Sequence, residues 1–176
     1  MLKKIGYILI FNTFLYLSIP SPQMPADLPN APKSQEPGDL RNPSNFAAYF
    51  TNLSREEVMA FYDAQFRYPF LPIIPNYQLI YPPEEAFTYI ADQTRSTHLR
   101  ELVHPFRESI FINFYEPKPE DDQIAYQGQP FRAKITVRYY QSYFWARLFI
   151  VGFTIMAIWY VIKAYYLQWR VWWKIK

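Results

Sequence analysis

An apolar run without a single charge, residues 148–162, lies near the C-terminus of the chain. With its flanks, residues 144–167, it would form a helix about 36 Å long at the ~1.5 Å rise per residue of an α-helix. This length is enough to cross a hydrocarbon core of about 30 Å. The pattern therefore predicts a transmembrane helix, with a membrane segment at residues 143–169.

Basic and aromatic side chains flank this predicted span. Arg147 and Lys163 fall near its two ends, where a long basic side chain can lie along apolar surface and lift its charge into the headgroup layer. Aromatic side chains are common at both membrane interfaces. We therefore expect the following residues at the membrane interface: Trp145, Arg147, Lys163, Tyr165, Tyr166 and Trp169.

Two lysines, Lys3 and Lys4, precede a second apolar run at residues 5–19. A secretory signal peptide has the same layout, but its cleavage site needs small residues, as in Ala-x-Ala. No such pair of small residues follows the run. We therefore expect residues 1–20 to be retained as a second membrane anchor, with a signal peptide as the alternative.

Residues 21–44 are rich in proline and show no hydrophobic period. Proline fixes φ and lacks an amide donor, so this segment should be an extended spacer. A docking motif for a proline-binding module is the alternative.

The pattern of a folded domain covers residues 45–142. Within it, Ser54 and Glu57 form a capping box that predicts a helix from Ser54 to about Phe66. Prolines break residues 67–81 into a loop that should end in a short strand at residues 77–81. A second helix is expected from Pro82 to about residue 93, with glutamates in its first turn.

Alternating apolar residues mark two strands further along the chain. One has Phe106, Ile110, Ile112 and Phe114 on a single face, and the other covers residues 131–140. Gly128 should lie in a turn. The elements predict an α+β fold, a small extracytoplasmic domain with two helices and a small, mostly antiparallel sheet. The C-terminal transmembrane helix and a basic cytoplasmic tail at residues 170–176 follow it.

The distribution of charge predicts how the chain lies in the membrane. All 15 Asp and Glu residues lie between Asp27 and Asp122, whereas basic residues stand outside both apolar runs. By the positive-inside tendency, both termini lie in the cytoplasm and the domain lies outside the cytoplasmic membrane. The sequence pI of about 9.0 comes from the flanks of the membrane segments. An acidic domain gives no reason to expect nucleic acid as a partner.

The chemistry-bearing residues form no recognisable catalytic or metal-binding motif. The chain has 2 His and no Cys, which removes thiolate nucleophiles, disulfides and Cys-ligated metals. His98, Glu101, His104 and Asp92 are close in sequence and can be written as an acid–base group, but such neighbours commonly form surface hydrogen bonds. We expect no catalytic residue, no cofactor and no metal site.

Three segments of the domain read AYFTNLSREEVMAFY at residues 48–62, YPPEEAFTYIADQTRSTHLRELVHPFRESIFINFYEP at residues 81–117 and KITVRYY at residues 134–140. Together they resemble a group of small uncharacterised membrane proteins of candidate-phyla (patescibacterial) bacteria. The resemblance covers most of the domain and the second span. It implies a bacterial cytoplasmic membrane and assigns no activity to any residue.

The sequence favours a membrane-anchored structural or protein-interaction component, with the lipid bilayer and another membrane protein as partners. The alternatives are an accessory subunit of a large membrane complex, such as a mitochondrial respiratory complex in the inner membrane, and a membrane-anchored enzyme. The domain has more aromatic residues than a core of under about 100 residues readily hides, so some should be exposed for contact. The set is Tyr68, Phe70, Tyr77, Tyr81, Tyr115, Tyr126, Tyr139 and Tyr140.

Overall fold

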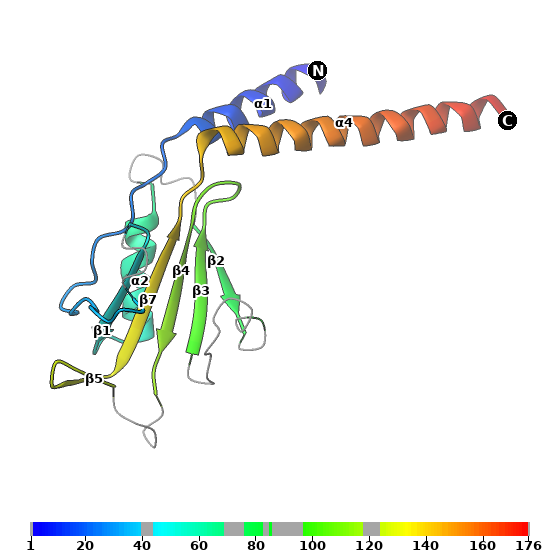
Figure 1. The fold of residues 1–176 in the computed structure, drawn as a ribbon. Coiled ribbons are helices and arrows are strands. Elements are labelled where there is room, and N and C mark those ends of the chain that lie inside the picture. The colour runs from blue at the N-terminus through cyan, green and yellow to red at the C-terminus, as the bar shows by residue number, and fades with distance from the viewer. Residues whose placement is uncertain are drawn as a thin grey trace. The chain divides into compact units, whose positions relative to one another are not determined.

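The computed structural model describes residues 2–39, 44–68, 76–82, 85, 97–117 and 124–175 (Figure 1). The chain divides into two compact units. One consists of Ser21–Gln141, and the other combines Met1–Pro20 with Ser142–Lys176. Each unit is described by itself below.

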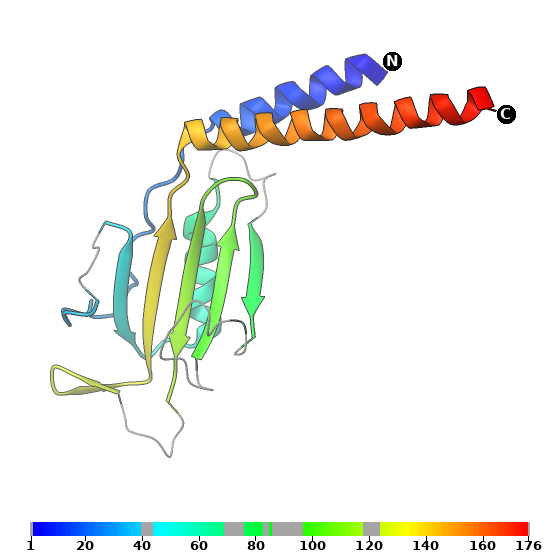
Figure 2. The ribbon, with the colours of Figure 1, turned by 45° about the vertical axis from the view of Figure 1, so that its right-hand side comes forward.

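The Ser21–Gln141 unit is an antiparallel sheet with a helix across one face (Figure 2). The order of the five strands is β1-β7-β4-β3-β2, and a separate two-stranded hairpin pairs β5 with β6. The α+β class and the mostly antiparallel sheet are thus confirmed. The bounds are β1 Phe46–Thr51, α2 Arg55–Phe66, β2 Tyr77–Tyr81, β3 Thr97–Val103, β4 Ser109–Tyr115, β5 Ile124–Tyr126, β6 Gln129–Phe131 and β7 Ala133–Tyr140.

Helix α2 begins as the capping box predicts. The Glu57 amide donates to the Ser54 hydroxyl at 3.3 Å, and the Ser54 amide donates to the Glu57 carboxylate at 2.7 Å. These bonds satisfy donors that the first turn of a helix leaves free, and they lower the pKa of Glu57. Val58, Tyr62 and Phe66 recur at a spacing of four residues and are buried against the sheet.

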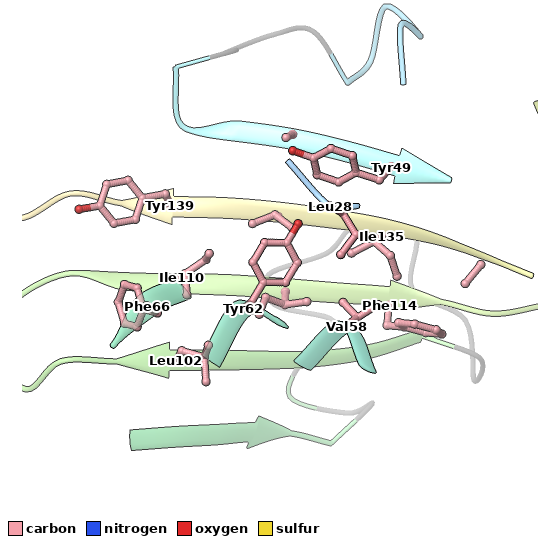
Figure 3. Close-up of a cluster of buried hydrophobic side chains, with 14 residues drawn as sticks. Leu28, Tyr49, Val58, Tyr62, Phe66, Leu102, Ile110, Phe114, Ile135 and Tyr139 are labelled. Carbon is pink, nitrogen blue, oxygen red and sulfur yellow. The ribbon is translucent and has the colours of Figure 1, made fainter. Parts of the chain in front are cut away.

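The core lies between α2 and the middle strands (Figure 3). Ile110, Ile112 and Phe114 of β4 stand opposite alternate residues of β7, so one face of both strands is apolar. The α2 side chains pack onto this face, and Leu102 of β3 and Tyr49 of β1 extend it on either side. The two strands predicted from alternation are therefore the central strands of the sheet.

Phe106 does not belong to this apolar face, so that part of the prediction was wrong. It lies in the connection between β3 and β4 with φ of 60° and is 68% exposed. The His104 amide donates to the Glu108 carbonyl at 3.0 Å, and the Arg107 amide donates to the His104 carbonyl at 2.9 Å. These bonds close a tight turn, and the strand begins only at Ser109.

The proline-rich segment, expected to be a spacer, forms part of the folded unit through residue 39. Leu28 is buried in the core, and Lys33 forms a β-bridge with Tyr49. The Ser34 amide donates to the Ala48 carbonyl at 2.8 Å, and the Phe50 amide donates to the Pro32 carbonyl at 3.0 Å. Residues 32–34 thus cover the outer edge of β1.

Two further sequence predictions concern the connections. Gln127 and Gly128 join β5 to β6 with φ of 52° and 77°, so the predicted turn is confirmed and has the left-handed geometry of a tight hairpin. The helix expected at residues 82–93 lies outside the described residues apart from positions 82 and 85.

The second unit contains helix α1, Leu2–Ser18, and helix α4, Phe144–Ile175. The C-terminal end of α1 meets the N-terminal end of α4, and the two helices run antiparallel from that junction (Figures 1 and 2). Among the described residues, the segment Phe144–Trp169 is the one helix long and apolar enough to cross a membrane by length and composition, with a mean hydropathy of 1.8. The apolar part of α1, Lys4–Ser18, is shorter.

Candidate functional site

The residues that can be written as an acid–base group are not brought together. Side chains alternate along β3, so His98 faces the α2 side of the sheet and Glu101 faces the opposite side. Burial, followed by the nearby charges of Arg55 and Arg100, lowers the pKa of His98. Asp92 lies outside the described residues.

Glu101 is buried and engaged within the sheet. Its carboxylate accepts a hydrogen bond from the hydroxyl of Tyr81 on the neighbouring strand β2. The Tyr81 ring also stacks on Phe111 of β4, with ring centroids 5.9 Å apart. Glu101 therefore helps to hold β2 against the sheet, whereas we expected an ordinary surface hydrogen bond.

His104 lies at the centre of a sealed polar cluster that the sequence did not reveal. Its side chain is fully buried. Nδ1 lies 3.0 Å from the Glu108 carboxylate, and Nε2 lies 2.9 Å from Oδ1 of Asn76. The Asn76 amide nitrogen donates to the backbone and side-chain oxygens of Asp63, at 3.0 and 3.2 Å, which fixes the amide so that Oδ1 faces the imidazole. Both ring nitrogens of His104 therefore lie within hydrogen-bonding distance of a polar side chain.

Two aromatic rings enclose the His104 imidazole. Phe66 stacks on one side at 4.2 Å and Tyr68 stacks at 4.4 Å between ring centroids. The Tyr68 hydroxyl donates to Glu108, and the Arg107 guanidinium lies 3.2 Å from the same carboxylate and 5.1 Å from the Tyr68 ring. Burial alone would raise the pKa of Glu108, but hydrogen bonds from His104 and Tyr68 and the charge of Arg107 lower it to about 2.

The His104 and Glu108 side chains of this cluster have no exposed surface. Its members come from the end of α2, the start of β2 and the turn between β3 and β4, so it fastens these three elements together. No group of three or more His, Cys, Asp or Glu side chains that could hold a metal ion occurs in the part of the chain that the structure describes.

Among the described residues of the Ser21–Gln141 unit, three exposed apolar side chains lie together on strand β2. Tyr77, Leu79 and Ile80 are 54%, 46% and 64% exposed. The expectation that some aromatic residues of the domain lie exposed is confirmed by Tyr77 and Tyr140, whereas Tyr68 and Tyr139 are buried. Tyr81, Tyr115 and Tyr126 are half-buried, and Phe70 lies outside the described residues.

The residues expected at the membrane interface divide into two groups in the helical unit. Trp145, Tyr165, Tyr166 and Trp169 are exposed. Lys163 is also exposed, and its ammonium lies 4.9 Å from the Trp159 ring centroid. These side chains are positioned to meet lipid headgroups if the helix spans a bilayer.

Arg147 differs from the others, because its guanidinium is buried instead of projecting outward. Nη1 donates to the carbonyls of Leu17 and Ile19 at 3.2 and 3.1 Å. Nε and Nη2 donate to the hydroxyl and carbonyl of Ser142 at 3.1 and 2.7 Å. The guanidinium therefore satisfies carbonyls at the C-terminal end of α1, where a helix leaves acceptors free and favours a cation.

Comparison with known proteins identifies no relative of this chain. No protein-family model, no curated protein and no solved structure matches it. The resemblance to the patescibacterial group stays a prediction that rests on the three segments quoted above.

Proposed function

We propose that this chain is a two-pass membrane protein in which α1 and α4 both lie in the bilayer. Support comes from Arg147, which binds the C-terminal carbonyls of α1 from the first turn of α4. An arginine at the end of a membrane helix is costly unless its charge reaches water, headgroups or backbone carbonyls. The contact gives α1 a structural role, which favours its retention over removal as a signal peptide.

In this proposal both termini lie in the cytoplasm and the Ser21–Gln141 unit lies outside the membrane. Two lysines in the first turn of α1 and basic residues after residue 162 support the orientation, since basic residues favour the cytoplasmic side. The carboxylates of the chain all belong to the outer unit.

The absence of Cys from the chain allows a direct test of this topology. Single cysteines would be placed between Met1 and Leu2, at Gln129 in the exposed β5–β6 hairpin, and after Lys176. A membrane-impermeant maleimide should label Gln129→Cys in intact cells and the two terminal cysteines only after lysis. Labelling of the N-terminal and C-terminal cysteines from opposite sides would contradict the two-pass arrangement.

We further propose that the outer unit is a protein-binding module and not an enzyme. The observation that carries this proposal is strand β2, which exposes Tyr77, Leu79 and Ile80 at the edge of the sheet. Exposed apolar residues gathered on one element are typical of a contact surface. The acid–base chemistry near them is enclosed, because the His104 and Glu108 side chains have no access to solvent.

A photo-crosslinking amino acid placed at Ile80 would test the binding role in living cells. We expect a product that contains a second protein chain, whereas the same group at Gln129, which is exposed on the separate hairpin, should give little. Absence of any protein product at Ile80, with normal amounts of the variant in the membrane, would contradict the binding role.

A further inference from the structure

The two edge strands of the five-stranded sheet, β1 and β2, differ in what pairs with their outer sides. At one edge, residues 32–34 pair with β1 through the bridge between Lys33 and Tyr49 and two backbone hydrogen bonds. At the other edge, β2 pairs with β3 on one side only, and no described strand pairs with its outer side (Figure 2). Among the described residues, one edge of the sheet is thus covered by residues 32–34, whereas the outer side of β2 has no strand paired with it.

Strand β2 also lacks the features that usually keep an exposed edge from pairing. Natural edge strands carry lysine, proline, a bulge or an inward-pointing charge, which prevent another strand from joining the sheet. The five residues of β2 read Tyr-Gln-Leu-Ile-Tyr, with no charge and no proline. Their register with β3 is continuous from Tyr77 to Tyr81, without a bulge. An added strand would meet neither a charge nor a steric block on β2 itself.

Two copies of β2 that run antiparallel can match like residues on one face of the sheet. An antiparallel pair centred on Leu79 places Leu79 opposite Leu79 and each Tyr77 opposite Tyr81 of the other copy, all on one face of the sheet. On the other face, each Gln78 stands opposite Ile80 of the other copy. Cross-strand aromatic and aliphatic pairs of this kind stabilise a sheet, and no like charges meet.

We propose that two copies of this chain associate through their β2 strands, with the two five-stranded sheets joined antiparallel about a two-fold axis at Leu79. The contact is isologous, so it closes after two copies and uses the β2 edge of both. This inference rests on the proposed role of the outer unit as a binding module and names its partner as a second copy. Five paired residues make a small interface, so the association is weak and depends on concentration.

Cysteine crosslinking tests both the contact and its register, because the natural chain has no Cys. In the Leu79-centred pair, two Leu79→Cys chains bring their Cα atoms to about 4.5 to 5.5 Å, within the range of a disulfide. Gln78→Cys alone places its two cysteines diagonally, about 7 to 8 Å apart, beyond that range. A mixture of Gln78→Cys chains and differently tagged Ile80→Cys chains again places two cysteines directly opposite each other.

The experiment uses the full chain in detergent micelles under mild oxidation, read on a non-reducing gel. We expect a covalent dimer from Leu79→Cys, a mixed dimer from the Gln78→Cys and Ile80→Cys mixture, and little product from Gln78→Cys alone. Gln129→Cys, on the exposed hairpin, measures random collisions. Crosslinking of Leu79→Cys no faster than that of Gln129→Cys would overturn the proposal, and failure of the mixed pair would overturn the register.

A charge substitution provides an independent measurement. Leu79→Glu would place two carboxylates opposite each other in the dimer, so the mass of the protein in sedimentation should fall to that of one chain. Ala125→Glu, an exposed position on β5, is the matched control and should leave the dimer unchanged. An unaltered dimer in Leu79→Glu would contradict pairing through β2.

The photo-crosslink at Ile80 separates this inference from the function on which it rests. A product made of two copies of this chain supports both proposals. A product that contains a different protein overturns the self-association and leaves the binding role standing. No protein product overturns both.

Discussion

Removal of the buried charge at Glu108 should lower the stability of the Ser21–Gln141 unit by an amount that depends on pH. Glu108→Gln keeps the shape of the side chain but removes the negative charge that faces Arg107 and His104. The pKa of Glu108 falls from its ordinary 4.5 to about 2 in the folded chain. At about 1.4 kcal/mol for each tenfold change in proton affinity, this corresponds to roughly 3 kcal/mol of stability at pH 7.

The sign follows from the direction of the shift. Because folding lowers the pKa of this carboxyl, its contribution is fully present above the unfolded value of about 4.5 and disappears as the pH falls through the folded value of about 2. The difference in free energy of unfolding between the natural chain and Glu108→Gln should therefore be constant near neutral pH. It should fall to roughly half by pH 3.

Pulse proteolysis in urea, with the full chain in detergent, would measure this difference. Glu56→Gln removes an exposed carboxylate from α2 and serves as the control, with an expected change well under about 1 kcal/mol. A Glu108→Gln effect below about 1 kcal/mol at pH 7, or one that stays the same down to pH 3, would refute the argument that the cluster holds this carboxylate in its charged form.

Three further predictions concern local features of the chain. Ser54→Ala should lower the free energy of unfolding by about 1 kcal/mol in the same urea assay, because it removes the capping hydroxyl of α2. Gly128→Ala should cost about 1 kcal/mol or more in thermal unfolding because φ is 77° there, whereas Gly152→Ala, within helix α4, should not destabilise the chain. Arg147→Lys should speed protease cleavage just after α1, because the three donors on one ammonium nitrogen cannot replace the four hydrogen bonds that the guanidinium makes to Leu17, Ile19 and Ser142.

The parts of the fold that could be predicted from sequence are those set by neighbouring residues. Ser54 and Glu57 contact each other within one helical turn, so the capping box identified the start of α2. The alternation of residues 131–140 identified β7 because only one of its faces is buried in the core. Gly128 marked its turn for a similar reason, since glycine is the residue best suited to a left-handed backbone.

The parts that escaped prediction depend on contacts between distant residues. Strand β1 shows no alternation because both of its faces are buried: Tyr49 joins the core, while Phe50 stacks on Tyr126 of β5 at 4.2 Å. The charged residues of β3 hid its strand character, since Glu101 is buried against Tyr81. His104 was considered only as a member of an acid–base group. Its contact with Asn76 could not be predicted, because the two residues are 28 positions apart and no local pattern connects them.

The contact between Arg147 and α1 implies an order of events during synthesis. The carbonyls of Leu17 and Ile19 receive their donor from a residue 130 and 128 positions later in the chain. Until Arg147 has been synthesised, these two carbonyls therefore lack the donor that its guanidinium supplies. A nascent chain that stops before the last helix cannot form this contact, so α1 can pair with α4 through Arg147 only at a late stage of synthesis.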